Sequence, residues 1–159
     1  MHESDRRSSP IQRPRVTVAA IAEREGRFLL VRERATGGAL VINQPAGHLE
    51  AGETLVEGVI RETLEETGWG FVPRDLVGIY QWQHPGGAQS FVRVALCGDV
   101  TARDQKRVLD DGIEEVVWLS FDEVIQNRDA LRSPLVMRCI EDYLAGERHP
   151  MTVLKFVAG

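Results

Sequence analysis

Glu62, Glu65 and Glu66 are the residues of this 159-residue chain whose type and spacing most directly suggest chemistry. On a helix, residues three and four positions apart lie side by side, so the three carboxylates become neighbours and repel one another. Only one cation, Arg61, lies within the cluster. Hard divalent cations prefer carboxylate oxygens as ligands, so the pattern predicts either a metal site or a solvated acidic helix face.

A helix over residues 54–67 is the element expected to carry these acids. Thr54 and Glu57 form a capping box at its start, and Gly68 supplies the stop at its end. Half of the helix is expected to face the core, and this half contains Leu55, Val56, Val59, Ile60, Thr63, Leu64 and Thr67. Gly58 lies in the acidic arc. It costs about 1 kcal/mol relative to alanine there, which suggests that another group approaches the backbone.

The residues on both sides of this helix complete a longer motif. Gly47 is followed after five residues by Glu53 and, after seven more, by Arg61-Glu62, Glu65-Glu66 and Gly68. All seven positions match the signature motif of Nudix hydrolases, so the segment 47–69 resembles a Nudix box. Thr63 and Trp69 are mild departures, because both stand at positions that are usually aliphatic in the family.

The resemblance implies an α+β fold, a Nudix-type αβα sandwich with a mixed sheet. It also implies hydrolysis of a diphosphate linked to another moiety, with Mg²⁺ or Mn²⁺ as cofactor. The metal ligands carried over to this chain are Glu62, Glu65, Glu66 and the main-chain carbonyl of Gly47. The catalytic residues carried over are Glu62, Glu65 and Arg61, with Arg61 orienting the acids and Glu53 bracing the loop. The general base lies either on the helix or in the loop over 110–115, which contains Asp110, Asp111, Glu114 and Glu115.

Further segments resemble one branch of the Nudix family. They are residues 14–19, 43–50, 81–82 and 131–136. That branch acts on thiamine and hydroxymethylpyrimidine pyrophosphates and on nucleoside tri- and diphosphates, so the resemblance implies release of orthophosphate. Two alternatives stay open: a nucleoside-diphosphate-sugar or dinucleotide pyrophosphatase, and a non-catalytic domain that senses a nucleotide. The complete set of acids speaks against the second alternative.

Three residues of two expected strands are candidates for contacts with the rest of the substrate. The face of Trp82 can stack on a pyrimidine or purine ring, and the amide of Gln81 can read a ring edge. Arg93 is a charge within an apolar strand and can bind a phosphate through its two-pronged guanidinium. The alternatives are that Trp82 belongs to the core and that Arg93 points to solvent from an edge strand.

The remaining pattern predicts one mixed domain over residues 15–159, preceded by a flexible tail over 1–14. Strands are expected over 16–22, 28–31, 76–82, 90–97 and 116–119, paired mostly as hairpins, with a loop over 34–43. Short helices are expected over 121–127, where Ser120 and Glu123 form a second capping box, and over 135–144.

Composition limits the classes of function. The net charge of −5 argues against a protein that coats polymeric nucleic acid or an anionic membrane. The partner that the Nudix resemblance implies is a small phosphoanhydride. Only Cys97 and Cys139 are present, far apart, which argues against a disulfide scaffold or a zinc ribbon. No apolar run reaches the length of a membrane span, and a cytoplasmic protein is expected. The oligomeric state stays open.

Overall fold

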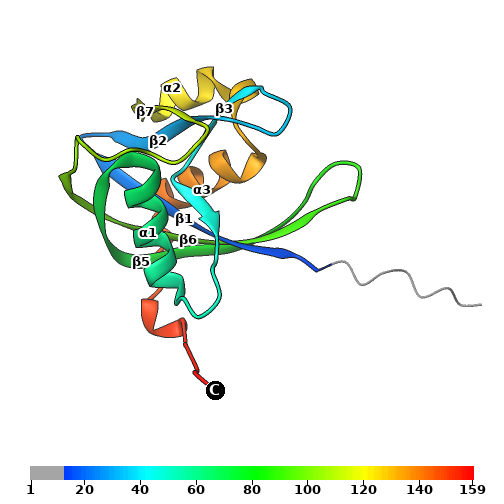
Figure 1. Ribbon diagram of the computed structural model, residues 1–159, viewed down its shortest axis with the longest axis vertical. Coiled ribbons are helices and arrows are strands. Elements are labelled where there is room, and N and C mark those ends of the chain that lie inside the picture. The colour runs from blue at the N-terminus through cyan, green and yellow to red at the C-terminus, as the bar shows by residue number, and fades with distance from the viewer. Residues whose placement is uncertain (1–12) are drawn as a thin grey trace, which may run out of the picture.

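The fold is a mixed seven-stranded sheet with helices on both faces, as expected of an α+β sandwich (Figure 1). It is seen in a computed structural model that describes residues 13–159, so most of the predicted tail lies outside the described residues. The strands are β1 (Arg15–Arg24), β2 (Arg27–Arg34), β3 (Leu40–Asn43), β4 (Ala46–His48), β5 (Trp69–Gln83), β6 (Ser90–Arg103) and β7 (Ile113–Ser120). The helices are α1 (Leu55–Thr67), α2 (Phe121–Gln126) and α3 (Pro134–Leu144), with 3₁₀ turns at Arg128–Ala130 and Met151–Val153.

Strand β1 is the centre of the sheet, whose main path runs β3-β2-β1-β6-β5. One edge of β1 pairs in parallel with β6, and the other edge is shared between β4 and β2. The expected hairpin of the first two strands is therefore reduced to the pairs Glu23 with Phe28 and Arg24 with Arg27. The reason is that β4 and Pro45 occupy the rest of this edge: β4 pairs with β1 from Thr17 to Ala19, and the Ala20 amide donates to the Pro45 carbonyl. The hairpin of β5 and β6 forms as predicted and projects beyond the rest of the sheet (Figure 1).

Two cores lie on opposite faces of the sheet, because successive side chains of a strand point to opposite faces. Val18 and Ala20 of β1 pack in a cluster with Val59 of α1. Ile21 packs in the other cluster with Cys139 and Ile140 of α3. This arrangement gives the αβα sandwich its two apolar layers and fixes α1 against one face of the sheet.

Helix α1 has the ends that the sequence predicts. Thr54 accepts a hydrogen bond from the Glu57 amide, Glu57 closes the capping box, and Gly68 ends the helix with a φ of 74°. The predicted core-facing half is partly wrong, because Ile60 is exposed whereas Glu62 and Glu66 are buried together with Val59. The helix is rotated toward the sheet so that its acids lie inside the protein, which a count of apolar residues does not reveal.

Other differences concern short strands. The expected loop over 34–43 contains β3, and β4 was not predicted, because both strands are short and are defined by their partners β2 and β1. The two later helices and the second capping box, Ser120 with Glu123, are confirmed. Both cysteines are buried and free. Within residues 13–159, no helix has both the length and the hydropathy needed to cross a membrane.

Candidate active site

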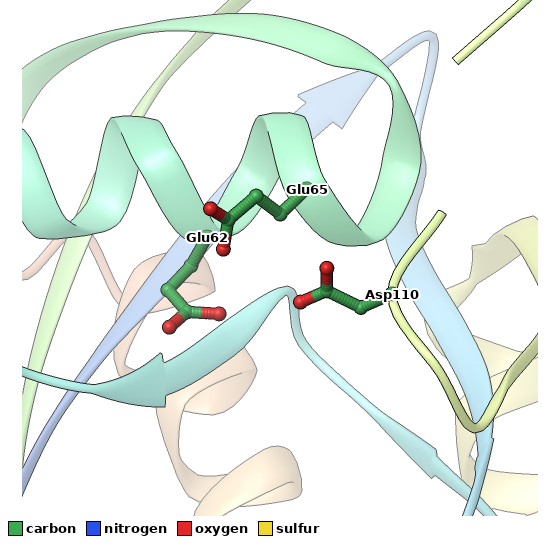
Figure 2. Close-up of side chains that lie close together, drawn as sticks. All are labelled: Glu62, Glu65 and Asp110. Atoms are coloured by element: carbon green, nitrogen blue, oxygen red, sulfur yellow. The ribbon is translucent and has the colours of Figure 1, made fainter. Parts of the chain in front are cut away.

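Three carboxylates from two elements meet beside α1. Glu62 and Glu65 project from the helix and Asp110 from the loop before β7, and one oxygen of each lies within 4.8 Å of the others (Figure 2). The amide of Asp110 donates to the carbonyl of Glu65 at 3.0 Å, which ties this loop to the helix. Of the four loop acids named in the sequence analysis, the structure brings Asp110 to the helix cluster, whereas Glu114 and Glu115 form ion pairs with Arg34 and Arg32.

Glu66 lies deeper than the other acids, with 4% of its surface exposed. Its Oε1 accepts a hydrogen bond from the Ala46 amide at 3.2 Å, and its Oε2 is buried without a hydrogen-bond partner in the described part of the chain. Burial, together with the negative charges of Glu33 and Glu62, raises the pKa of Glu66 far above its usual value. Glu66 therefore offers a buried carboxylate oxygen of the kind that binds a hard cation.

Arg61 gathers the acids around it. It donates to Glu53 at 2.6 and 3.0 Å, to Glu62 at 2.7 Å and to Glu65 at 3.1 Å, and its Nη2 also reaches the carbonyl of His48 at 3.1 Å. The hydrogen bonds with Arg61 lower the pKa of the Glu53 carboxyl, and the same contacts raise the pKa of the guanidinium. Glu53 and Arg61 thus occupy the bracing and orienting positions that the motif implied.

Two glycines allow close approach to these acids. A Cβ on Gly47 of β4 would collide with the carboxylate of Glu62, so only glycine fits between β4 and α1 here. A Cβ on Gly58 would meet Glu53 Oε2 at 3.0 Å and Leu49 Cδ1 at 3.3 Å. The group expected to approach the helix at Gly58 is therefore the carboxylate that braces Arg61.

A cavity of about 400 Å³ begins at Gly47 and extends toward the projecting hairpin. Its lining includes Trp82, Phe91 and Arg93 from β5 and β6, and Glu33 and Arg132 from the opposite side. Trp82 is half-buried and stacks on Phe91 with ring centroids 5.6 Å apart. A large aromatic surface is thus present in the same cavity as the glycine beside the acids.

Gln81 lies outside this cavity. It lines a second hollow on the other side of Trp82, together with Tyr80 and Arg138, and none of the clustered acids lines that hollow. The structure therefore brings two of the three expected substrate contacts, Trp82 and Arg93, to the cavity that begins at Gly47 and does not bring the third.

Arg93 is buried and not solvated. It is 5% exposed, because β6 lies between β1 and β5 and is not an edge strand. Its Nη1 donates to Gln44 Oε1 at 2.9 Å and its Nη2 to Asn43 Oδ1 at 3.3 Å. The alternative of an arginine pointing to solvent is wrong.

Sequence reasoning did not single out Glu33, at the end of β2. Its Oε1 accepts from Asn43 at 3.2 Å and from Arg132 at 3.1 Å, and the carboxylate lies near enough to Glu66 to influence its pKa. Glu33 stands among alternating charges, Arg32 and Arg34, and no local pattern separates it from a surface residue. Its place in the cavity depends on the pairing of β2 with β3.

The chain was compared with known proteins. Residues 12–139 match the family model described as the NUDIX domain. The protein belongs to the Nudix family. Phosphatase NudJ of Escherichia coli K12 is 40% identical over 142 residues, which cover 89% of this chain and 91% of that protein. A solved NUDIX hydrolase from Nitrosomonas europaea is 45% identical, with a TM-score of 0.89 over 91% of this chain and 98% of that one.

A more distant structure shares the fold alone. The MutT NUDIX hydrolase from Burkholderia pseudomallei is 22% identical, with a TM-score of 0.71 over 82% of this chain and 98% of that one. Together, the family model, the NudJ relatives and the solved Nudix structures identify the chain as a hydrolase of phosphoanhydride bonds.

Proposed function

We propose that the protein is a phosphohydrolase that depends on Mg²⁺ or Mn²⁺ and releases orthophosphate from small organic di- and triphosphates. The observation that carries the proposal is the set of carboxylates at Gly47, which adjoins a cavity with an exposed aromatic face. The expected substrates are thiamine or hydroxymethylpyrimidine pyrophosphate and nucleoside tri- or diphosphates. Similarity to a phosphatase over most of the chain supports release of orthophosphate.

The donor set fits a hard divalent cation. Every nearby donor is an oxygen, and the buried Oε2 of Glu66 has no protein partner among the described residues. The residues that would hold the metal are those that the motif implies, namely Glu62, Glu65, Glu66 and the carbonyl of Gly47. The structure groups Glu62 and Glu65 with Asp110, and Glu66 lies deeper, beside Glu62. When bound, a divalent cation compensates the carboxylates, binds phosphate oxygens and lowers the pKa of a water molecule.

The chain itself supplies orientation and a base. Arg61 holds Glu62 and Glu65 in place and is itself held by Glu53. A carboxylate of the cluster accepts the proton of the attacking water as the phosphoanhydride bond breaks. Asp110 is a candidate for this role besides the helix acids, because it lies beside Glu62 and Glu65 in the cluster, where desolvation and the charge of Glu65 raise the pKa of its carboxyl.

The organic part of the substrate is assigned to the cavity beyond Gly47. Trp82 offers a flat apolar surface there, and stacking on an aromatic ring contributes about 0.5–1.5 kcal/mol beyond the burial of area. Gln81 is left out of this assignment, since it lines a different hollow.

We further propose that the protein acts in the cytoplasm on small molecules, without polymeric nucleic acid or membrane as a partner. The net charge of −5 supports the absence of these polyanionic partners.

The test is a phosphate-release screen over thiamine, hydroxymethylpyrimidine and nucleoside di- and triphosphates, with Mg²⁺ and with a chelator. We expect orthophosphate in the presence of Mg²⁺ and none with chelator. Two organic monophosphates without orthophosphate would instead identify a nucleoside-diphosphate-sugar or dinucleotide pyrophosphatase. Nucleotide binding without any turnover would identify a sensing domain and overturn the proposal.

A further inference from the structure

The connection from β3 to β4 forms the wall of the site opposite α1. Its last residues carry two contacts with the acids: the Ala46 amide donates to Glu66, and Gly47 lies against the carboxylate of Glu62. β4 itself has only three residues, so its pairing with β1 gives this wall a short anchor. Two main-chain hydrogen bonds, from the Ala20 amide to the Pro45 carbonyl and from the Leu49 amide to the Val16 carbonyl, extend this anchor, and side-chain contacts add to it.

Arg93 of β6 contributes side-chain contacts to the connection between β3 and β4. Its guanidinium donates to the side-chain oxygens of two consecutive residues, Gln44 at 2.9 Å and Asn43 at 3.3 Å. The other end of the Gln44 amide donates to the carbonyl of Val136 in α3 at 2.8 Å, and the amide nitrogen of Asn43 donates to Glu33. A planar guanidinium presents its donors in a fixed geometry, so it sets the distance and the angle between these two amides.

These hydrogen bonds of Arg93 also limit the role that the sequence predicts for it, which is to bind a phosphate. Both Nη atoms already donate to amide oxygens, and Nε is buried without a hydrogen-bond partner in residues 13–159. Burial lowers the pKa of the Arg93 guanidinium, and the neighbouring Cys139, Glu33 and Glu66 oppose this shift. The side chain is thus built into the protein between α3 and the wall of the site.

We propose that Arg93 is a positioning residue of the hydrolytic site, whose guanidinium holds Asn43 and Gln44 and thereby places Ala46 and Gly47 against Glu66 and Glu62. The inference rests on the proposed function, because the site it serves is the metal-dependent one. It replaces the direct phosphate contact expected from the sequence. Replacing a residue that orients metal ligands through hydrogen bonds commonly lowers metal affinity or activity about 10–100-fold.

The test compares Arg93→Met, Arg93→Lys and Gln44→Met with the wild type. We expect each variant to lower kcat about 10–100-fold with little change in KM, and to weaken Mn²⁺ binding to the protein without substrate. The kcat of the double variant Arg93→Met with Gln44→Met should be little lower than that of either single variant, because both substitutions remove the same Arg93–Gln44 contact. Lysine keeps the charge but lacks the planar fork, so it should not restore the rate.

Arg74→Met is the matched control, since Arg74 is an exposed arginine on the neighbouring strand β5, paired with Asp99. A higher KM for Arg93→Lys, with kcat, Mn²⁺ binding and the Gln44→Met enzyme unchanged, would overturn the proposal in favour of a direct phosphate contact. Unchanged kcat and Mn²⁺ binding in all three single variants would show that Arg93 has only a structural role, which would also overturn the proposal.

Circular dichroism shows whether Arg93→Met folds, and if it does not, Arg93→Lys and Gln44→Met decide the question by the same measurements. If the wild type releases no phosphate with Mg²⁺, the proposed function fails. In that event the Mn²⁺ titrations of the variants still show whether Arg93 positions the acids.

Discussion

At the scale of single residues, burial distinguishes the acids of α1 from an ordinary charged helix face. Glu62 and Glu66 are 8% and 4% exposed, although each carries a carboxylate. Arg61 donates to Glu53, Glu62 and Glu65, whereas Glu66 accepts from the Ala46 amide. A buried charge without a partner is costly, so the residue that most needs a cation is Glu66.

Replacing the buried acids should abolish turnover. We expect Glu66→Gln and Glu62→Gln to lower kcat at least about 100-fold in a phosphate-release assay with Mg²⁺, more than a supporting residue would. Glu57→Gln is the matched control, because it lies on the same helix and glutamine also completes a capping box. Wild-type turnover in Glu66→Gln would contradict the assignment of this acid to the site.

Asp110 and Asp111 form a natural pair for testing the loop. Both residues are exposed, but Asp110 belongs to the cluster with Glu62 and Glu65, and Asp111 is its neighbour in the chain. We expect Asp110→Asn to lower kcat about 100-fold, within the range usual for a general base, and Asp111→Asn to stay close to the wild type. Equal kcat values for the two variants would indicate that the general base is one of the acids of α1 and not Asp110.

The buried Glu66 should also make the metal-free protein sensitive to pH. Its pKa is raised in the folded state, whereas in the unfolded chain it returns toward the ordinary value of 4.5. The folded protein then holds a proton that the unfolded chain releases, so the free energy of unfolding falls as the pH rises above that value.

Urea unfolding in the presence of chelator, between about pH 5 and 8, measures this loss. Glu66→Gln cannot titrate, and we expect its stability to vary less with pH over the same range. An identical pH dependence in the two proteins would show that Glu66 is not the group responsible.

At the scale of elements, the ends of the helices and the local hairpin of β5 and β6 could be predicted, whereas the pairing of strands far apart in the sequence could not. The limits of α1 depend on local chemistry, namely the capping box of Thr54 with Glu57 and the left-handed Gly68. The partners of β1 depend on segments more than 25 residues away, such as β4 and β6. The same holds for the site: the motif named the helix acids, whereas the position of Glu33 in the cavity and that of Asp110 beside Glu62 and Glu65 depend on how distant segments pack.

Gly58 links the geometry of α1 to the chemistry of the site. In a helix interior, alanine is favoured over glycine by about 1 kcal/mol, but here its Cβ would press on the carboxylate of Glu53. Glu53 is held by two hydrogen bonds from Arg61, so a shift of Glu53 moves the group that orients Glu62 and Glu65.

We therefore expect Gly58→Ala to change the free energy of unfolding by less than about 1 kcal/mol, because the gain in helix propensity offsets the contact. Its kcat should fall about tenfold, the lower end of the range for a supporting residue. Urea unfolding and phosphate release measure the two effects. A variant that is stabilised and fully active would show that Glu53 can move without disturbing Arg61.

At the scale of the whole molecule, the charge is concentrated at the site. Residues 47–69 contain six glutamates and one arginine, which account for the entire net charge of −5, and the rest of the chain is balanced. A polyanionic substrate therefore meets repulsion mainly at the place where it has to bind. A divalent cation reverses that local field without changing the rest of the surface.

Divalent metal should accordingly stabilise the whole protein. A ligand that binds only the folded state, at 100 times its Kd, adds about 2.7 kcal/mol to the free energy of unfolding. For a chain of this size, that corresponds to a rise in Tm of about 5–11 °C with Mg²⁺ or Mn²⁺. Glu66→Gln should lose most of this rise, although it should be no less stable than the wild type in chelator. K⁺ at equal ionic strength is the control, because an equal rise with K⁺ would mean that general screening, and not a site between α1, β4 and the Asp110 loop, stabilises the fold.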